Sequence, residues 1–256
     1  MIGRLLIRGM LAGLAAGAVA FVVAYLLGEG PLSAGVAYEH ATTAKQAMPG
    51  MAEEPELVSR TVQATLGLGV VALLFGVALG GLFGLAFAAT QGRLGNISTR
   101  ASAAVVAVAG FVGVYLIPQL KYPSNPPGVN AGDSIGARTG AYLAILVVGV
   151  AVVIGVIVLA RRLRERFTGW NATLLAMLTG AVVLAATYLL LPRIDETPPD
   201  FPATVLWQFR VSSFAAQAAL WTSIGLLFGT LTDRAARREH TTQQHRRGQH
   251  PEAVPG

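Results

Sequence analysis

The sequence predicts an all-α integral membrane protein, a bundle of about six transmembrane helices joined by short loops. Of its 256 residues, 54% are hydrophobic and only 12% are charged, whereas a soluble domain carries roughly 25% charged residues. The hydrophobic residues gather in six runs, each close to the roughly 20 residues that a helix needs to cross a hydrocarbon core. The stretches between the runs are too short to bury a core of their own.

The six runs are rich in Ala, Leu and Val, and we expect helices because every backbone amide in lipid must be paired within its own segment or in a closed barrel. The alternating pattern of barrel strands is not seen. The predicted spans are 9–27, 64–89, 101–120, 139–160, 172–191 and 211–231, within a bundle of residues 1–233. The number falls to five if the first run is a cleaved signal peptide or the more polar last run is not a span.

The basic residues divide unevenly between the two sides of these spans. One side carries thirteen, namely Arg4, Arg8, Arg93, Arg100, the four arginines of 161–166 and the five of the tail, and the other side carries six. The richer side of a membrane protein faces the cytoplasm. We therefore expect a cell (inner or plasma) membrane protein with both termini in the cytoplasm, and a disordered basic tail over 234–256 that holds His240, His245 and His250.

The composition also excludes several functions. The net charge of +6 comes from basic residues between apolar runs, so it indicates membrane topology and contact with lipid rather than nucleic acid. Cysteine is absent, which excludes thiolate metal sites and cysteine nucleophiles. The Gly-x-Ser-x-Gly pattern at 132–136 follows no strand. We predict no enzyme activity and no permanently bound cofactor.

Glycine recurs at four-residue spacing in the first two spans. Such stripes allow two helix backbones to approach closely, which is how helices associate in lipid. They are expected to pack within the chain, although an oligomer interface, a partner surface or a pore lining stays open. The glycines are Gly9, Gly13 and Gly17, then Gly76, Gly80 and Gly84.

The segments predicted on the outer side are acidic and rich in proline. Prolines fix φ and remove backbone donors, so these segments present free carbonyl oxygens beside carboxylates. Imidazole and carboxylate ligands suit borderline cations such as cobalt, nickel or zinc. We predict a capture site for a divalent metal made from Glu39, His40, Asp195, Glu196 and Asp200. The alternative is that these carboxylates are only solvated charges and helix caps.

Two motifs in these segments resemble the CbtA family of cobalt transporter subunits. The first runs from Leu120 to Pro127, with the sequence LKYPSNPP, and is followed by IGART at 135–139. The second is DFPATVLWQFR at 200–210, with Gln217 and Trp221 beyond it. By position, the motif residues carried over from the resemblance are Lys121, Asn125, Asp200, Arg210 and Gln217.

Membership of this family implies a membrane subunit that takes up Co²⁺ for cobalamin biosynthesis, beside a small histidine-bearing membrane partner of the CbtB type. An oligomer is also possible. The alternative is a non-conducting accessory or scaffold subunit that binds its partner through the glycines of the first span. No Asp or Glu falls within the six predicted runs, which disfavours proton coupling because a proton-coupled pump normally needs acidic residues in mid-span.

Overall fold

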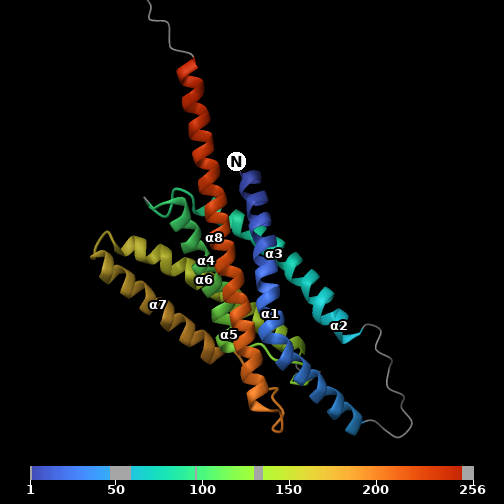
Figure 1. Ribbon diagram of the computed structural model, residues 1–256. Coiled ribbons are helices and arrows are strands. Elements are labelled where there is room, and N and C mark those ends of the chain that lie inside the picture. Colours follow the sequence, from blue (N-terminus) through green and yellow to red (C-terminus); the bar gives the residue numbers. More distant parts are fainter. Residues whose placement is uncertain (1, 47–58, 96, 130–134, 250–256) are drawn as a thin grey trace, which may run out of the picture. The chain divides into compact units, whose positions relative to one another are not determined.

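The computed structural model describes residues 2–46, 59–95, 97–129 and 135–249, and these residues form helices and no strands (Figure 1). Six of the helical segments are long and apolar enough to cross a membrane: Ile2–Lys45, Arg60–Thr90, Thr99–Lys121, Gly136–Leu163, Gly169–Leu190 and Ala203–Arg238. Each predicted span overlaps one of these segments. The prediction of an all-α membrane protein with six spans is therefore confirmed.

The helices follow one another along the chain with short connections. They are α1 (Ile2–Gln46), α2 (Arg60–Val62), the π-helix η1 (Gln63–Gly67), α3 (Leu68–Thr90), α4 (Thr99–Gly110), the π-helix η2 (Phe111–Leu116), α5 (Ile117–Lys121), α6 (Ile135–Leu163), α7 (Gly169–Leu190) and α8 (Ala203–Gln249). The segments α2, η1 and α3 form one continuous span, and so do α4, η2 and α5. The chain divides into two compact units.

The first unit comprises Met1–Val19, Ala72–Ala107 and Leu220–Gly256. Its tightest contact is between the two glycine stripes of α1 and α3. A Cβ atom built on Gly13 would lie 2.0 Å from the Gly76 carbonyl oxygen, and one on Gly9 would lie 2.1 Å from that of Gly80. The two backbones thus touch where only glycine fits, so the two stripes pack on each other within this unit. Consequently, the Gly9, Gly13 and Gly17 face is not a free surface for a partner.

In the same unit, α4 packs on the middle of α8 through small residues. A Cβ on Gly225 would lie 2.7 Å from the Ala107 side chain, and one on Gly229 would lie 3.2 Å from that of Ala103. Phe228 is fully buried, with ring centroids 5.1 Å from Phe83 and 4.9 Å from Phe87 in edge-on contacts. Interlocking aromatic and small residues are how these helices gain dispersion energy without a hydrophobic drive from lipid.

The second unit comprises Ala20–Val71 and Val108–Ala219. Within it, α6 and α7 form an antiparallel hairpin whose helices lie side by side (Figure 1), with Gly180 of α7 packed closely against Val156 of α6. The π-helix η2 crosses α6 where Gly113 and Gly149 meet. A small core of Ile117, Tyr122, Ala141 and Ile145 lies at the end of this packing that adjoins the predicted outer segments.

Two segments differ from the sequence prediction. Residues 28–46 were predicted as part of an outer loop, but α1 continues through them and carries Pro31 within it. Helix α1 has 45 residues. At about 1.5 Å per residue it reaches about 68 Å, more than twice the roughly 30 Å hydrocarbon core. The reason is that a single Pro removes one hydrogen bond, while the Ala, Leu and Glu residues around it favour helix.

The predicted disordered tail also differs. Helix α8 continues to Gln249, so residues 234–249 are helical. This stretch is rich in Arg, Gln and Ala, which are good helix formers, and has no Gly or Pro before Gly248. An ion pair one turn apart, between Asp233 and Arg237, supports its start. Residues 250–256, with His250, lie outside the described residues.

Candidate functional site

The first family-like motif begins where α5 ends. Lys121 is the last residue of α5, and the prolines that follow it cannot continue a helix. The Lys121 ammonium donates to the carbonyl oxygens of Tyr188 at 2.7 Å and of Leu191 at 3.2 Å. These carbonyls lie at the C-terminal end of α7, where backbone oxygens lack helical partners and the helix dipole favours a cation. Lys121 therefore caps a neighbouring helix.

Two tyrosines reinforce this junction. The Tyr122 hydroxyl donates to the Pro192 carbonyl oxygen at 2.8 Å, and the Tyr188 hydroxyl donates to that of Ile117 at 2.6 Å. Burial raises the pKa of Tyr122 above its usual 10. The hydroxyl therefore stays protonated and remains a donor at neutral pH. Together with Lys121, these bonds hold the segment after α5 against the segment after α7.

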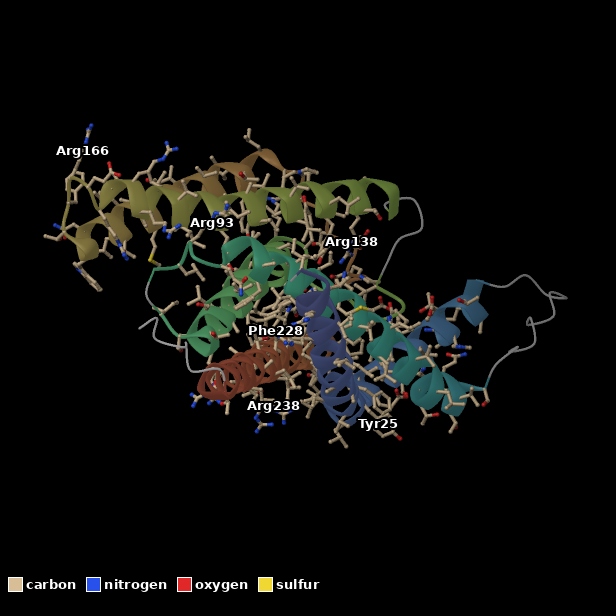
Figure 2. All side chains as sticks on the ribbon, turned by 90° about the horizontal axis from the view of Figure 1, so that it is seen from above. Tyr25, Arg93, Arg138, Arg166, Phe228 and Arg238 are labelled. Atoms are coloured by element: carbon tan, nitrogen blue, oxygen red, sulfur yellow. The ribbon has the colours of Figure 1, made fainter. Side chains whose placement is uncertain are left out.

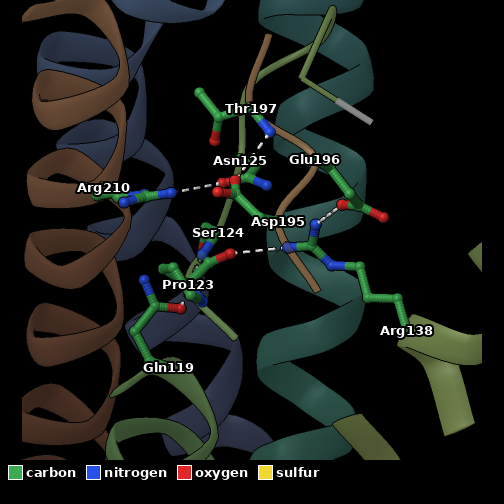
Figure 3. A network of polar contacts seen from close by, with 9 residues as sticks. All are labelled: Gln119, Pro123, Ser124, Asn125, Arg138, Asp195, Glu196, Thr197 and Arg210. Carbon is green, nitrogen blue, oxygen red and sulfur yellow. Dashed lines mark hydrogen bonds and ion pairs between the residues drawn. The ribbon is translucent and has the colours of Figure 1, made fainter. Parts of the chain in front are cut away.

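Arg138, near the start of α6, joins the same two segments (Figure 3). One of its guanidinium nitrogens is ion-paired with the Glu196 carboxylate, and the other donates to the Pro123 carbonyl oxygen at 2.8 Å. The Glu196 side chain is only 2% exposed and that of Arg138 is 22% exposed. A buried carboxylate needs such a partner, because an uncompensated charge is costly away from water.

Arg210 of α8 reaches the motif from another direction. Its guanidinium donates to the side-chain oxygen of Asn125 at 3.0 Å, which ties α8 to the proline-rich segment (Figure 3). Next to Asn125, the Ser124 amide and hydroxyl both donate to the Gln119 side-chain oxygen. Asp195 is exposed and accepts from the Thr197 amide at 3.2 Å. We call the nine residues drawn in Figure 3 the polar network; they are Gln119, Pro123, Ser124, Asn125, Arg138, Asp195, Glu196, Thr197 and Arg210.

Asp200 belongs to a neighbouring contact. The Tyr38 hydroxyl, on the extended part of α1, donates to the Asp200 carboxylate at 2.7 Å. The Tyr38 ring packs edge-on against Phe201, with centroids 4.8 Å apart, and lies against Gly128. Gly128 has a φ of +81°, and a Cβ there would lie 2.8 Å from the Tyr38 ring. Only glycine suits that turn.

The predicted metal ligands are thus spread over several places. Glu196 and Asp200 already have partners, Asp195 is exposed beside them, and Glu39 and His40 lie exposed on α1. Among the residues that the structure describes, no three His, Cys, Asp or Glu side chains form a group that could hold a metal ion. The metal assignment stays a prediction. By contrast, Lys121, Asn125 and Arg210 hold segments together, and Gln217 is half-buried on α8.

One ion pair was not anticipated from the sequence. Glu29 accepts from Arg60 at 2.9 Å and from the Ser33 hydroxyl at 2.8 Å. The second carboxylate oxygen of Glu29 and the Arg60 Nε are buried without a hydrogen-bond partner. Because α1 does not stop at Leu27, this carboxylate is part of a helix rather than a loop. The sequence offered a hint of this pair, because Glu29 lies just after the first apolar run and Arg60 lies just before the second.

A family model described as "Probable cobalt transporter subunit (CbtA)" matches residues 2–233.

The chain belongs to the CbtA family.

The match covers both sequence motifs, at 120–127 and 200–210. It also covers the six candidate spans as far as Asp233. Most of the extension of α8 after Asp233 lies beyond it. Comparison with curated proteins and comparison with solved structures each gave no match. The geometry of the network is therefore described from this chain itself, and the family description names a transporter subunit rather than a reaction.

Proposed function

We propose that the chain is a membrane subunit of an uptake transporter for cobalt or a similar divalent cation, and that the cation is captured on the side of the membrane where the polar network lies. The family description supports the transport of cobalt. Six apolar helices support a multi-pass membrane protein. The observation that carries the capture step is that the oxygens of the network already bind cations, namely the guanidinium groups of Arg138 and Arg210.

The proposed capture is an exchange of one cation for another. Carboxylate, amide and carbonyl oxygens that hold a guanidinium group are the same oxygen types that coordinate a divalent metal. Exposed Asp195 is the natural first contact, next to Glu196 and Asn125. Movement of Arg138 away from Glu196 would then free a carboxylate for the ion. The arginines would keep the buried oxygens compensated whenever no metal is present.

Energy for uptake is available without a nucleotide. If this face lies outside and both termini lie in the cytoplasm, a divalent cation entering with the membrane potential gains about 4.6 kcal/mol per 100 mV. The proposed setting is the cell membrane of a cobalamin-synthesising cell, with a small histidine-bearing membrane partner. We further propose that the cation crosses the membrane through this chain itself.

A non-conducting accessory subunit is the second candidate. It is favoured by two observations: no group of three metal-ligating side chains is found in the described residues, and Glu196 and Asp200 are held by other side chains. A partner would not bind at the stripe of Gly9, Gly13 and Gly17, which α3 covers. In this version, the partner conducts the ion and the present chain stabilises or gates it.

Uptake of radiolabelled cobalt separates these candidates. Cells lacking their own cobalt importers would express the chain alone, the histidine-bearing partner alone, or both. A conducting subunit predicts uptake that needs this chain, whereas an accessory subunit predicts uptake by the partner alone that the chain only increases. Uptake no greater than that of cells with an empty vector in all three cases would contradict both.

A further inference from the structure

The turn that joins α6 to α7 carries an unusual concentration of positive charge. Four arginines occur in six residues, all of them exposed, and the only carboxylate among them is the exposed Glu165. Figure 2 shows Arg166 at the end of this hairpin, pointing away from the ribbon. The arginines are Arg161, Arg162, Arg164 and Arg166.

These charges are not compensated within the described part of the chain. None of the four arginines lies within ion-pair distance of a carboxylate there, whereas Arg100 and Arg237 both pair with Asp233. The charges of the turn are therefore available to an external anion. Mutual repulsion of four cations in a short turn makes an anionic partner favourable.

The turn is also held in a defined conformation. Its backbone amides bond back to the end of α6, from Arg164 to Ala160 at 3.2 Å and from Phe167 to Leu163 at 2.9 Å. Thr168 caps α7 by accepting from the Asn171 amide. The Arg164 side chain lies over Gly169, the first residue of α7, so its charge adds to the positive end of a 22-residue helix dipole.

The location of the turn indicates which anion it meets. The turn connects two apolar spans, Gly136–Leu163 and Gly169–Leu190, and so lies at a membrane surface whichever side that is. Phe167 and Trp170 flank the arginines and are 46% and 73% exposed. Exposed aromatic rings beside a span end are typical of the layer of lipid headgroups. An anion that is abundant in that layer is the lipid phosphate.

We propose that the α6–α7 turn, residues 161–170, is a binding site for the headgroups of anionic phospholipids. The guanidinium groups pair with phosphate oxygens in two-point contacts, the aromatic rings lie at the level of the headgroups, and the first amides of α7 face the same charge. This lipid would hold the hairpin at a set depth. The site is separate from the polar network and does not depend on the proposed transport.

Lipid binding can be measured on the detergent-purified full chain by native mass spectrometry. The chain is titrated with phosphatidylglycerol or with phosphatidylcholine of the same acyl length. The test variant is Arg164→Gln/Arg166→Gln, and the matched control is Arg8→Gln/Arg234→Gln, which removes the same charge elsewhere. Since each arginine near an anionic surface strengthens binding roughly fivefold, the test variant should bind phosphatidylglycerol about 25-fold more weakly.

The control variant should keep most of the binding, and salt should weaken binding in the unaltered chain. Arg164→Lys/Arg166→Lys should keep only part of it, because lysine retains the charge but not the two-point contact. Equal affinity for the two lipids would overturn the proposal. So would an equal loss in the test and control variants, because the effect would then come from net charge alone. Displacement of the lipid by an equimolar amount of inorganic phosphate would show a free-anion site and would also overturn it.

Discussion

The Arg138 guanidinium is ion-paired with a Glu196 carboxylate that is almost completely buried. Arg138 lies near the start of α6, and Glu196 follows α7, so the pair closes the end of the α6–α7 hairpin opposite the arginine-rich turn. Through the Pro123 carbonyl oxygen, the same guanidinium also reaches the segment after α5. Three segments that are far apart in the sequence thus depend on one positive charge, and this makes the pair the natural place to test the network.

Replacing Glu196 by Gln should lower the free energy of unfolding by about 2 kcal/mol. Loss of one member of a buried pair leaves the other charge uncompensated, and the effect is below the roughly 3–5 kcal/mol of fully buried pairs because Arg138 retains some water contact. Thermal unfolding of the purified chain would measure it. Adding Arg138→Gln should restore part of the loss, and Glu165→Gln should have no effect. A fully additive double variant would argue against the pair.

A second prediction concerns the glycine stripes. In Gly13→Ala the new methyl group would meet the Gly76 carbonyl oxygen at 2.0 Å, so the backbones of α1 and α3 must separate. Overpacking of this kind costs about 1–3 kcal/mol, and we expect the upper part of that range because backbone atoms cannot rotate away. Gly140→Ala is the matched control, since nothing lies within 4 Å of its Cβ position. Equal thermal stability of the two variants would contradict the packing.

These contacts show what the sequence could and could not predict. The six spans could be predicted from apolar length, and four-residue glycine spacing indicated close helix packing, because both are local patterns. The extension of α1 beyond Leu27 was missed, since Gly28, Gly30 and Pro31 resemble a stop signal and only the whole helix shows that they are not one.

The polar network was predicted only in part. The sequence singled out Glu196, Asn125 and Arg210, but assigned the carboxylates to an incoming metal. Glu196 pairs with Arg138, which is 58 residues away in the sequence, and Asn125 pairs with Arg210, which is 85 residues away. No local pattern reports contacts over such separations. The acidic, carbonyl-rich segments indicated oxygens that bind a cation. Only the fold shows that arginines of the chain itself occupy them.

Lys121 provides a third prediction. Lys121→Met keeps an apolar stem of similar length but removes the donor to Tyr188 and Leu191. The last turn of α7 should then open more easily, with faster amide hydrogen exchange there and a loss of about 1.5–3 kcal/mol, typical of hydrogen bonds to a charged group. Exchange in the first turn of α7 serves as the internal control. Unchanged exchange at residues 187–191 would show that the cap does not stabilise the helix.

The absence of cysteine allows a direct test of topology. Arg193→Cys lies beside the polar network, and Glu165→Cys lies in the α6–α7 turn, at opposite ends of α7. With both termini in the cytoplasm, a membrane-impermeant maleimide should label Arg193→Cys in intact cells and Glu165→Cys only after the membrane is opened. The reverse pattern would place the network in the cytoplasm and would contradict capture from outside.

Cobalt binding to the purified full chain tests the central claim most directly. Equilibrium dialysis with Co²⁺ would compare the unaltered chain with Asp195→Asn/Glu196→Gln, which alters the two carboxylates of the network, and with Glu165→Gln as the control that removes a carboxylate elsewhere. Exchange at the polar network predicts that the unaltered chain and the control bind Co²⁺, while the double variant binds at least about tenfold more weakly, a difference of about 1.4 kcal/mol. Equal binding by all three chains, or none by the unaltered chain, would contradict it.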